Sequence, residues 1–325
     1  MQLTDGHRVK YERKDRQAVN YLYMMVFLLP LFIKGNAIHP LSPIYSFIMI
    51  PLIEPFAILG YVSFLSLPFI SVFKVYSAFL LSVLKILNSL DYALPIGNWN
   101  DLTIFIYYYG LALFFSFRDI GFTDFSNSVA LLGVLSLAVS VNPLMNIGLN
   151  QVVFLNVGQG DCVFIRNETK TVMIDTGGNT SFDIAKEVLI PFFRKERVTK
   201  LDYLILSHND ADHAGGVDSL KENFKVRNVI RKHESFPLTI GDLKFESYNE
   251  GGFGDANDDS LVLSLDFIGK KWLFTGDAST KTEKEILEKH PSLTCDILKV
   301  GHHGSDTSSS IEFLDQLKPK EAIIS

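Results

Sequence analysis

The 325-residue chain has few cysteines, no excess of basic charge and, in its first part, few charges of either sign. Two cysteines, Cys162 and Cys295, cannot form a disulfide framework, and each lies in an apolar, strand-like run typical of a small buried residue. A net charge of −6 argues against a generally basic nucleic-acid binder. Residues 1–145 are strongly apolar and the rest are polar, which predicts a membrane part followed by a soluble part.

The apolar part, taken as residues 21–149, is predicted to cross the membrane four or five times, because each span needs about 20 residues. Its apolar runs are Tyr21–Ile33, Pro43–Phe73, Leu102–Phe117 and Ser128–Val141. The second run is long enough for two spans and has candidate helix breaks at Pro51, Pro55, Gly60 and Pro68. Its single charge, Glu54, is as consistent with a functional site as with an interfacial position.

Two further segments complete this part. Residues 1–20 form a polar N-terminal segment. Residues 74–94 are interpreted as an amphipathic helix on the membrane surface, because polar residues interrupt the apolar pattern at helical spacing. Arg118, in the loop before the last apolar run, favours an inside position for that loop, which would place the soluble domain outside the cell membrane.

The polar part, residues 150–325, begins with short strands bounded by glycine and polar turns. Strands are expected at residues 151–156, 162–166, 171–175 and 201–206, with a helix at 182–189. A hairpin at 261–265 and 271–274 and a buried strand at 296–300 follow. Strands interleaved with helical segments predict an α/β domain.

The strand at 201–206 leads directly into four candidate metal ligands, His208, Asp210, Asp212 and His213. Imidazole and carboxylate groups suit zinc, manganese or iron. The two pairs can point at two different ions, and two ions about 3.5–4 Å apart are the usual arrangement for phosphoester hydrolysis. The alternative is a polar loop with capping aspartates, which the density of His and Asp makes the weaker interpretation.

Two other predicted strands end in groups of the same kind. Asp277 follows the strand at 271–274 and could bridge two ions or be a simple turn residue. His302 and His303 follow the strand at 296–300, and they would point in opposite directions if the strand continued. We favour His302 as the ligand, which leaves His303 to face the substrate.

Two basic clusters lie in this part of the chain, Arg194/Lys195/Arg197/Lys200 and Arg227/Arg231/Lys232. A solvated surface is the ordinary interpretation of such clusters. Contact with a phosphate backbone is the alternative.

The order of these motifs resembles the metallo-β-lactamase superfamily, whose first motif is usually HxHxDH, with Asp210 here in place of the second His. The similarity is more specific to the ComEC family of DNA-uptake proteins. It rests on residues 156–161, 174–178, 207–213, 274–277 and 298–305, with the turn at 95–97 and the stretch 41–51 resembling the end of that family's competence domain. The resemblance implies an αββα sandwich preceded by all-α transmembrane helices, and it suggests that the chain stops short of the family's C-terminal end.

The resemblance also implies two divalent ions, zinc or manganese, in the soluble domain. One would be held by His208, Asp210 and Asp277, and the other by Asp212, His213, Asp277 and His302. Asp212, Asp210 and His303 are the candidate catalytic residues. Asp161 and Asp175 would orient ligands or serve as turn residues. The superfamily's additional His is missing, and Asn257, Asp258, Asp259 and Ser260 occupy the corresponding loop.

The implied function is DNA uptake in natural transformation, with a nuclease domain outside the cell that degrades the strand that is not imported. The expected partners are single-stranded DNA, membrane lipid and other competence proteins. One alternative is a membrane-tethered phosphodiesterase for a small ester or a wall polymer. The other is a channel subunit whose hydrolase domain is inactive, which the missing His favours.

Overall fold

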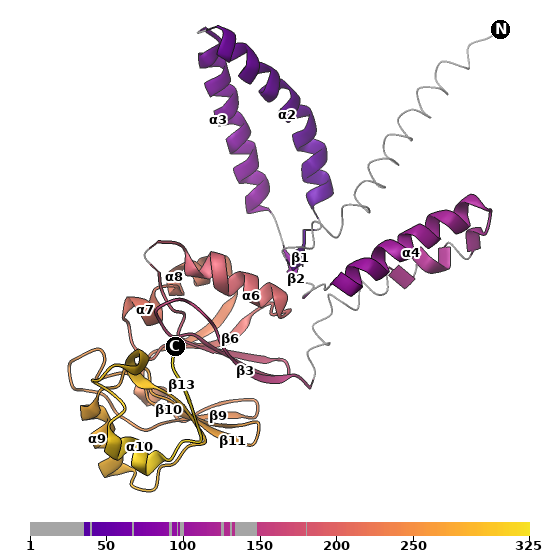
Figure 1. The fold of residues 1–325 in the computed structure, drawn as a ribbon. Helices are drawn as coiled ribbons and strands as arrows, with labels where there is room; N and C mark the ends of the chain where they lie inside the picture. Colours follow the sequence, from indigo (N-terminus) through magenta and orange to yellow (C-terminus); the bar gives the residue numbers. More distant parts are fainter. Residues whose placement is uncertain are drawn as a thin grey trace, which may run out of the picture. The chain divides into compact units, whose positions relative to one another are not determined.

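A computed structural model describes residues 36–39, 41–66, 68–90, 93–95, 97, 101–124, 127–130, 132–133, 148–179 and 181–325. The chain divides into two units, Met1–Val141 and Asn142–Ser325, and each is described by itself (Figure 1). The predicted polar segment 1–20, the apolar run Tyr21–Ile33 and most of the run Ser128–Val141 lie outside the described residues.

The described part of the first unit is mainly helical. Its helices are α2 (Ser42–Leu65), α3 (Pro68–Ser89) and α4 (Asp101–Asp119). Two short strands, β1 (Ala37–Ile38) and β2 (Leu94–Pro95), pair antiparallel. By length and composition, α2 and α3 could each cross a membrane, over Ile44–Phe64 and Pro68–Ser89, whereas the apolar stretch of α4, Ile104–Phe117, is shorter.

The helix breaks differ from the prediction. Pro51 and Pro55 lie inside α2, and the chain breaks only before Pro68, the first residue of α3. Each internal proline removes one N–H donor, and a spacing of four residues puts both on one face, so the rest of the hydrogen-bond ladder is kept. The helix expected at 74–94 begins at Pro68, where proline's fixed φ suits a first helical position, and it ends at Ser89.

The second unit contains two sheets. The first has the order β3-β4-β5-β6-β7, with strands Asn150–Phe154, Val163–Asn167, Lys170–Ile174, Leu201–Ile205 and Val226–Ile230. The second has the order β13-β12-β11-β10-β9-β8, and from β8 to β13 its strands are Leu238–Ile240, Leu243–Ser247, Leu263–Phe267, Lys270–Phe274, Ile297–Lys299 and Glu321–Ile323. All the strands predicted in this unit are found, within two residues at each end.

Helices cover the outer faces of the two sheets. A π-helical turn (Ala185–Leu189), α6 (Ile190–Lys195) and α8 (Val217–Asn223) pack on the first sheet. Helices α9 (Thr280–Lys289) and α10 (Ile311–Leu317) pack on the second. A third apolar cluster joins the inner faces of both sheets. The unit is therefore an αββα sandwich, as the sequence predicted (Figure 1).

Strand alternation explains how one strand serves two of these clusters. In β4, Val163 and Ile165 belong to the cluster between the sheets, whereas Phe164 packs under the helices of the first sheet. In β5, Val172 and Met173 divide in the same way. Successive side chains of a strand point to opposite faces, so a continuous apolar run fills both layers.

Candidate metal centre

The candidate metal centre lies where three strands of the second unit end. The segments after β6, β11 and β12 bring Asp212, His213, Asp277 and His303 together, and one ligand atom from each lies within 4.8 Å of the others. Asp212 and His213 belong to a one-turn helix, α7 (Ala211–Ala214). The turn after β5 passes so close to α7 that a Cβ on Gly178 would lie 1.7 Å from a backbone oxygen there. The predicted Gly-Gly turn is therefore required by packing.

The buried atoms of this group are the observation that fits a metal. His208 Nε2, His213 Nε2 and Asp277 Oδ1 are buried and form no hydrogen bond, although His213 Nε2 lies 3.0 Å from Asp277 Oδ1. Buried polar atoms are normally satisfied, because leaving one unsatisfied costs about 1–3 kcal/mol. Imidazole nitrogens and a carboxylate oxygen are the donors that zinc or manganese takes. The residues present therefore fit a divalent cation.

The electrostatics of the group are dominated by the pairing of His213 with carboxylates. Burial lowers the pKa of His213, but Asp175 and Asp277 on its two ring nitrogens outweigh burial and raise that pKa to about 10. Burial raises the pKa of Asp277, but the neighbouring imidazoles outweigh it and lower the pKa to about 2. The carboxylates therefore favour the protonated form of His213, and the imidazoles favour the ionised form of Asp277.

His208 and Asp210 lie beside this group. The His208 and His213 rings are 4.1 Å apart, and His208 Nε2 lies 3.7 Å from Asp210 Oδ2. Burial, followed by the charge of His213, lowers the pKa of His208. Asp210 is exposed, so it stands at the solvent side of the centre. The structure thus brings His208 and Asp210 to the same place as the four clustered residues.

The two histidines after β12 do not alternate as predicted. The strand ends at Lys299, and residues 301–304 form a turn in which His302 and His303 both have positive φ, of 46° and 53°. His303 Nε2 lies 3.3 Å from Asp212 Oδ2, which places His303 in the clustered group. His302 contacts Thr307 Oγ1 through Nδ1 at 2.9 Å, and its Nε2 is 3.9 Å from Asp277 Oδ2. The strand therefore does not continue through the two histidines, and the choice of His302 rather than His303 as the ligand stays a prediction.

Asp175 and Asp161 lie behind the clustered histidines. Asp175 Oδ2 is 2.9 Å from His213 Nδ1, and Asp175 Oδ1 accepts a hydrogen bond from the Ser207 backbone N–H at 2.7 Å. Asp161 Oδ1 is 3.5 Å from His303 Nδ1. Asp161 also forms a close ion pair with Lys299, which is only 3 % exposed. Sequence reasoning gave Lys299 no role, although a lysine inside an apolar strand was a usable signal.

The loop that corresponds to the missing histidine supplies a serine rather than a carboxylate. Asp258 bonds to Ser279, and Asp259 accepts backbone N–H groups of Phe253 and Gly254. Neither carboxylate is among the clustered groups. Ser260 does reach the centre, since its Oγ lies 3.2 Å from His208 Nδ1 and accepts the Asp277 backbone N–H at 3.2 Å.

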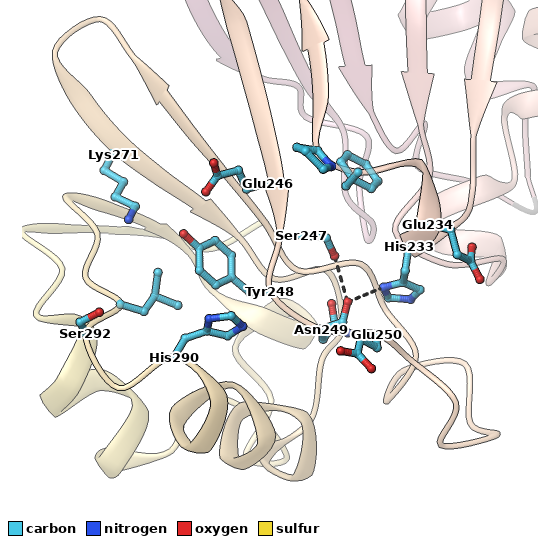
Figure 2. Close-up of a pocket in the computed structure, with 13 residues that line it drawn as sticks. His233, Glu234, Glu246, Ser247, Tyr248, Asn249, Glu250, Lys271, His290 and Ser292 are labelled. Atoms are coloured by element: carbon cyan, nitrogen blue, oxygen red, sulfur yellow. Dashed lines mark hydrogen bonds between the residues drawn. The ribbon is translucent and has the colours of Figure 1, made fainter.

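A separate pocket of about 860 Å³ lies elsewhere in the second unit, at the ends of β8, β9 and α9 (Figure 2). Its lining includes His233, Tyr248, Lys271 and His290. His233 is held by the backbone oxygens of Asn249 and Asp259, at 2.9 and 3.0 Å. None of the residues predicted for the metal centre lines this pocket.

The class of the second unit follows from its sheets, its site and a family match. Residues 155–255 match the family described as "Metallo-beta-lactamase superfamily", and the αββα unit has the metallo-β-lactamase fold. The chain is also 34 % identical to "ComE operon protein 3" of Bacillus subtilis (strain 168), over 54 % of this chain and 28 % of that protein. It is 32 % identical to "Recombination protein 2" of Haemophilus influenzae, over 54 % of this chain and 24 % of that protein.

A third relative is a competence protein by name. The chain is 31 % identical to "Competence protein ComA" of Neisseria gonorrhoeae, over 52 % of this chain and 26 % of that protein. The protein is therefore a homologue of the ComEC/Rec2/ComA competence proteins that carries a metallo-β-lactamase domain. It spans about a quarter of the length of these relatives.

Proposed function

We propose that this protein is a membrane component of DNA uptake whose metallo-β-lactamase domain is a metal-dependent phosphodiesterase. The domain would act outside the cell and degrade the DNA strand that is not imported. Three observations support this: the competence relatives, the two helices long enough to span a membrane, and the buried His/Asp group. The main support is that His208, His213 and Asp277 each have a buried polar atom without a hydrogen-bond partner.

Two divalent ions, zinc or manganese, are the proposed cofactors. His208, Asp210 and Asp277 would hold one, and Asp212, His213 and Asp277 would hold the other together with His303 or His302. Bound ions of this kind supply an activated water and offset negative charge on a phosphodiester.

The protein's own residues set the orientation of these ligands. Asp175 accepts a hydrogen bond from Nδ1 of His213, which holds the ring so that Nε2, 3.0 Å from Asp277 Oδ1, would face the ion together with that carboxylate. Ser207 Oγ and Ser260 Oγ, 3.0 and 3.2 Å from His208 Nδ1, can do the same for His208. His303 and Asp210 are the candidates for protonating the leaving group. His303 Nε2 faces Asp212, and Asp210 lies at the exposed rim.

The cellular setting is also part of the proposal. Helix α2 would be one span of a multi-pass segment in the cell membrane, in contact with lipid. Helix α3 would be a second span rather than the surface helix predicted for residues 74–94, because Pro68–Ser89 is long and apolar enough to cross. Single-stranded DNA and other proteins of the competence machinery are the proposed partners. A tether for a small-ester phosphodiesterase would need one span, whereas two candidate spans occur in the described residues alone.

Metal content and cleavage test this proposal together. The full chain, purified in detergent, should bind two zinc or manganese ions and cleave single-stranded DNA. Asp212→Ala should lose at least one ion and most of the activity, whereas Asp218→Ala, an exposed aspartate on α8, should change neither. Less than one bound ion per chain would contradict the two-metal centre. A metal-loaded protein that cleaves a small phosphodiester but not DNA would instead support the wall-polymer or small-ester alternative.

A further inference from the structure

The sheet topology brings two basic residues to the metal centre. Strands β6 and β7 are parallel neighbours, with Ile205 opposite Ile230, and the Leu206 N–H donates to the Ile230 oxygen at 2.9 Å. The residues that follow β7 therefore emerge at the same edge as the residues that follow β6. Those residues are Arg231 and Lys232 after β7, and the segment 208–213 after β6.

Arg231 reaches into that segment directly. Its Nη1 donates a short hydrogen bond to Asn209 Oδ1, and Asn209 stands between His208 and Asp210. Arg231, Lys232 and Asn209 are all exposed. Across the described ranges, no carboxylate forms an ion pair with Arg231 or Lys232. A guanidinium has five N–H donors, so most of its hydrogen-bonding capacity is left for another acceptor.

Arg227 shows that the basic cluster identified in the sequence has two parts. It lies on β7, four residues before Arg231, but its Nη1 pairs with Asp202 Oδ1 at 3.0 Å. Asp202 Oδ1 also forms an ion pair with Lys200 Nζ at 3.0 Å. Arg227 is therefore a surface residue with a carboxylate partner, whereas Arg231 is a cation beside the metal segment. The two arginines form a natural matched pair for an experiment.

We infer that Arg231, assisted by Lys232, binds a phosphate of a nucleic-acid strand that lies across the metal centre. This inference rests on the proposed function and deepens it by choosing a polyanionic strand over a small phosphodiester as the substrate. An acidic protein with net charge −6 needs local cations to hold a polyanion. Arginine presents paired donors that match a phosphate, so a phosphate next to the scissile one would fix the register of the strand.

Binding tests this contact without relying on catalysis. The detergent-purified full chain would be titrated into a 5′-fluorescein-labelled, phosphorothioate-linked dT12 strand, which keeps the backbone charge and resists cleavage. Fluorescence anisotropy would give the Kd at low and at high salt. Arg231→Gln should weaken binding about tenfold at the lowest salt, and the slope of log K against log salt should become about 0.7 less steep. Arg227→Gln should stay within about twofold of wild type.

Small-substrate kinetics give the second readout. Arg231→Gln should lower kcat/KM for an unmodified dT12 strand about tenfold and lower kcat/KM for bis(p-nitrophenyl) phosphate much less, because the small substrate has no second phosphate. Arg227→Gln, whose arginine pairs with Asp202, should leave both values unchanged. Arg231→Lys, which keeps the charge, should recover part of the strand affinity. These two results would separate a phosphate contact from a general disturbance of the metal segment.

The outcomes divide cleanly. The inference is overturned if the wild-type protein does not bind the strand, or if Arg231→Gln binds it as tightly as wild type does. It is also overturned if Arg227→Gln loses as much affinity as Arg231→Gln. Weakened strand binding in Arg231→Gln alone, in a protein that hydrolyses no phosphodiester, would support the contact and remove the proposed activity. If the protein hydrolyses bis(p-nitrophenyl) phosphate and Arg231→Gln does not change strand binding, the proposed phosphodiesterase activity is supported and the Arg231 contact is removed.

Discussion

The two units of this protein place the same kind of side chain in opposite surroundings. On α2, Phe64 is 91 % exposed, whereas Phe164 in β4 is 0 % exposed. The sandwich buries its apolar residues between its own layers. Helices α2 and α3 bury little beyond one another, through contacts such as the Phe56 and Phe73 rings at 5.1 Å. The apolar surroundings that such helices need must come from lipid or from protein outside the described residues.

Charged groups show the same contrast. In the sandwich, buried charges have partners, as in the pairs of Lys299 with Asp161 and of His213 with Asp175. Glu54 lies at the middle of the apolar stretch Ile44–Phe64 and is exposed. A fold that supplies its own interior can satisfy its buried charges locally. A helix that relies on external apolar surroundings leaves its charge to be satisfied by something else.

The largest test of this contrast removes one phenylalanine from each unit. Phe164→Ala should lower the free energy of unfolding of the sandwich by about 4 kcal/mol, since it empties a fully buried site. Phe64→Ala should leave it unchanged. Urea unfolding of the full chain in detergent, followed by Trp272 fluorescence in a Trp99→Phe background, measures both. Equal losses would show that the exposed face of α2 supports the sandwich.

A smaller effect is expected from a charged partner behind the metal centre. Asp175→Asn should weaken metal binding by about 10–100-fold, because His213 loses the carboxylate that orients it. The metal affinity would be measured by competition with a chromophoric chelator. Asp218→Asn on α8, an exposed aspartate, is the control. Unchanged affinity in Asp175→Asn would mean that backbone packing alone sets the His213 ring.

The sequence predicted the site best where residues of one chemical type gather directly after a predicted strand, and less well elsewhere. A candidate metal site at the strand ends could be predicted, because many imidazoles and carboxylates directly after buried strands are typical of one. Its residues are His208, Asp210, Asp212, His213 and Asp277. The choice between His302 and His303 could not be predicted, since it depends on a turn with two positive φ angles that no strand period encodes. The hairpin β8–β9 was missed, because β8 has only three residues, too short a run to show a period of two.

In the helical unit, local breaking signals were misleading. Proline is a strong break in water, yet Pro51 and Pro55 lie within α2. The contact between Arg231 and Asn209 could not be predicted either, since the two residues are 22 positions apart and meet only through the pairing of β6 and β7. What the sequence does not encode locally is which strands become neighbours.

A charge network around Asp202, at the start of β6, should give a pH-dependent effect. Burial raises the pKa of Asp202, but Lys200, the Thr171 N–H and Arg227 outweigh it and hold that pKa below its usual value. A depressed carboxyl pKa stabilises the fold above the unfolded-state value of 3.8 and loses that contribution as the pH falls through the folded value. Asp202→Asn should therefore cost about 1 kcal/mol at neutral pH and less as the pH falls below the unfolded-state value. Urea titrations of wild type and Asp202→Asn at neutral pH and at a pH below the unfolded-state value would measure this difference in unfolding free energy. A difference that does not change with pH would contradict the prediction.

The smallest effect is expected between the two long helices, where the comparison is sharpest. Tyr76 of α3 donates a hydrogen bond to the Leu52 backbone oxygen of α2 at 2.9 Å. In lipid, such a bond between helices contributes only about 0.6 kcal/mol, because the separated helices find other partners. Tyr76→Phe should therefore lose its helical circular dichroism at a slightly lower SDS fraction than wild type. Tyr61→Phe is the control, because Tyr61 on α2 is 79 % exposed. A loss of several kcal/mol would mean that polar bonds hold the helix pair together as they hold the metal centre, which would remove the distinction between the two units.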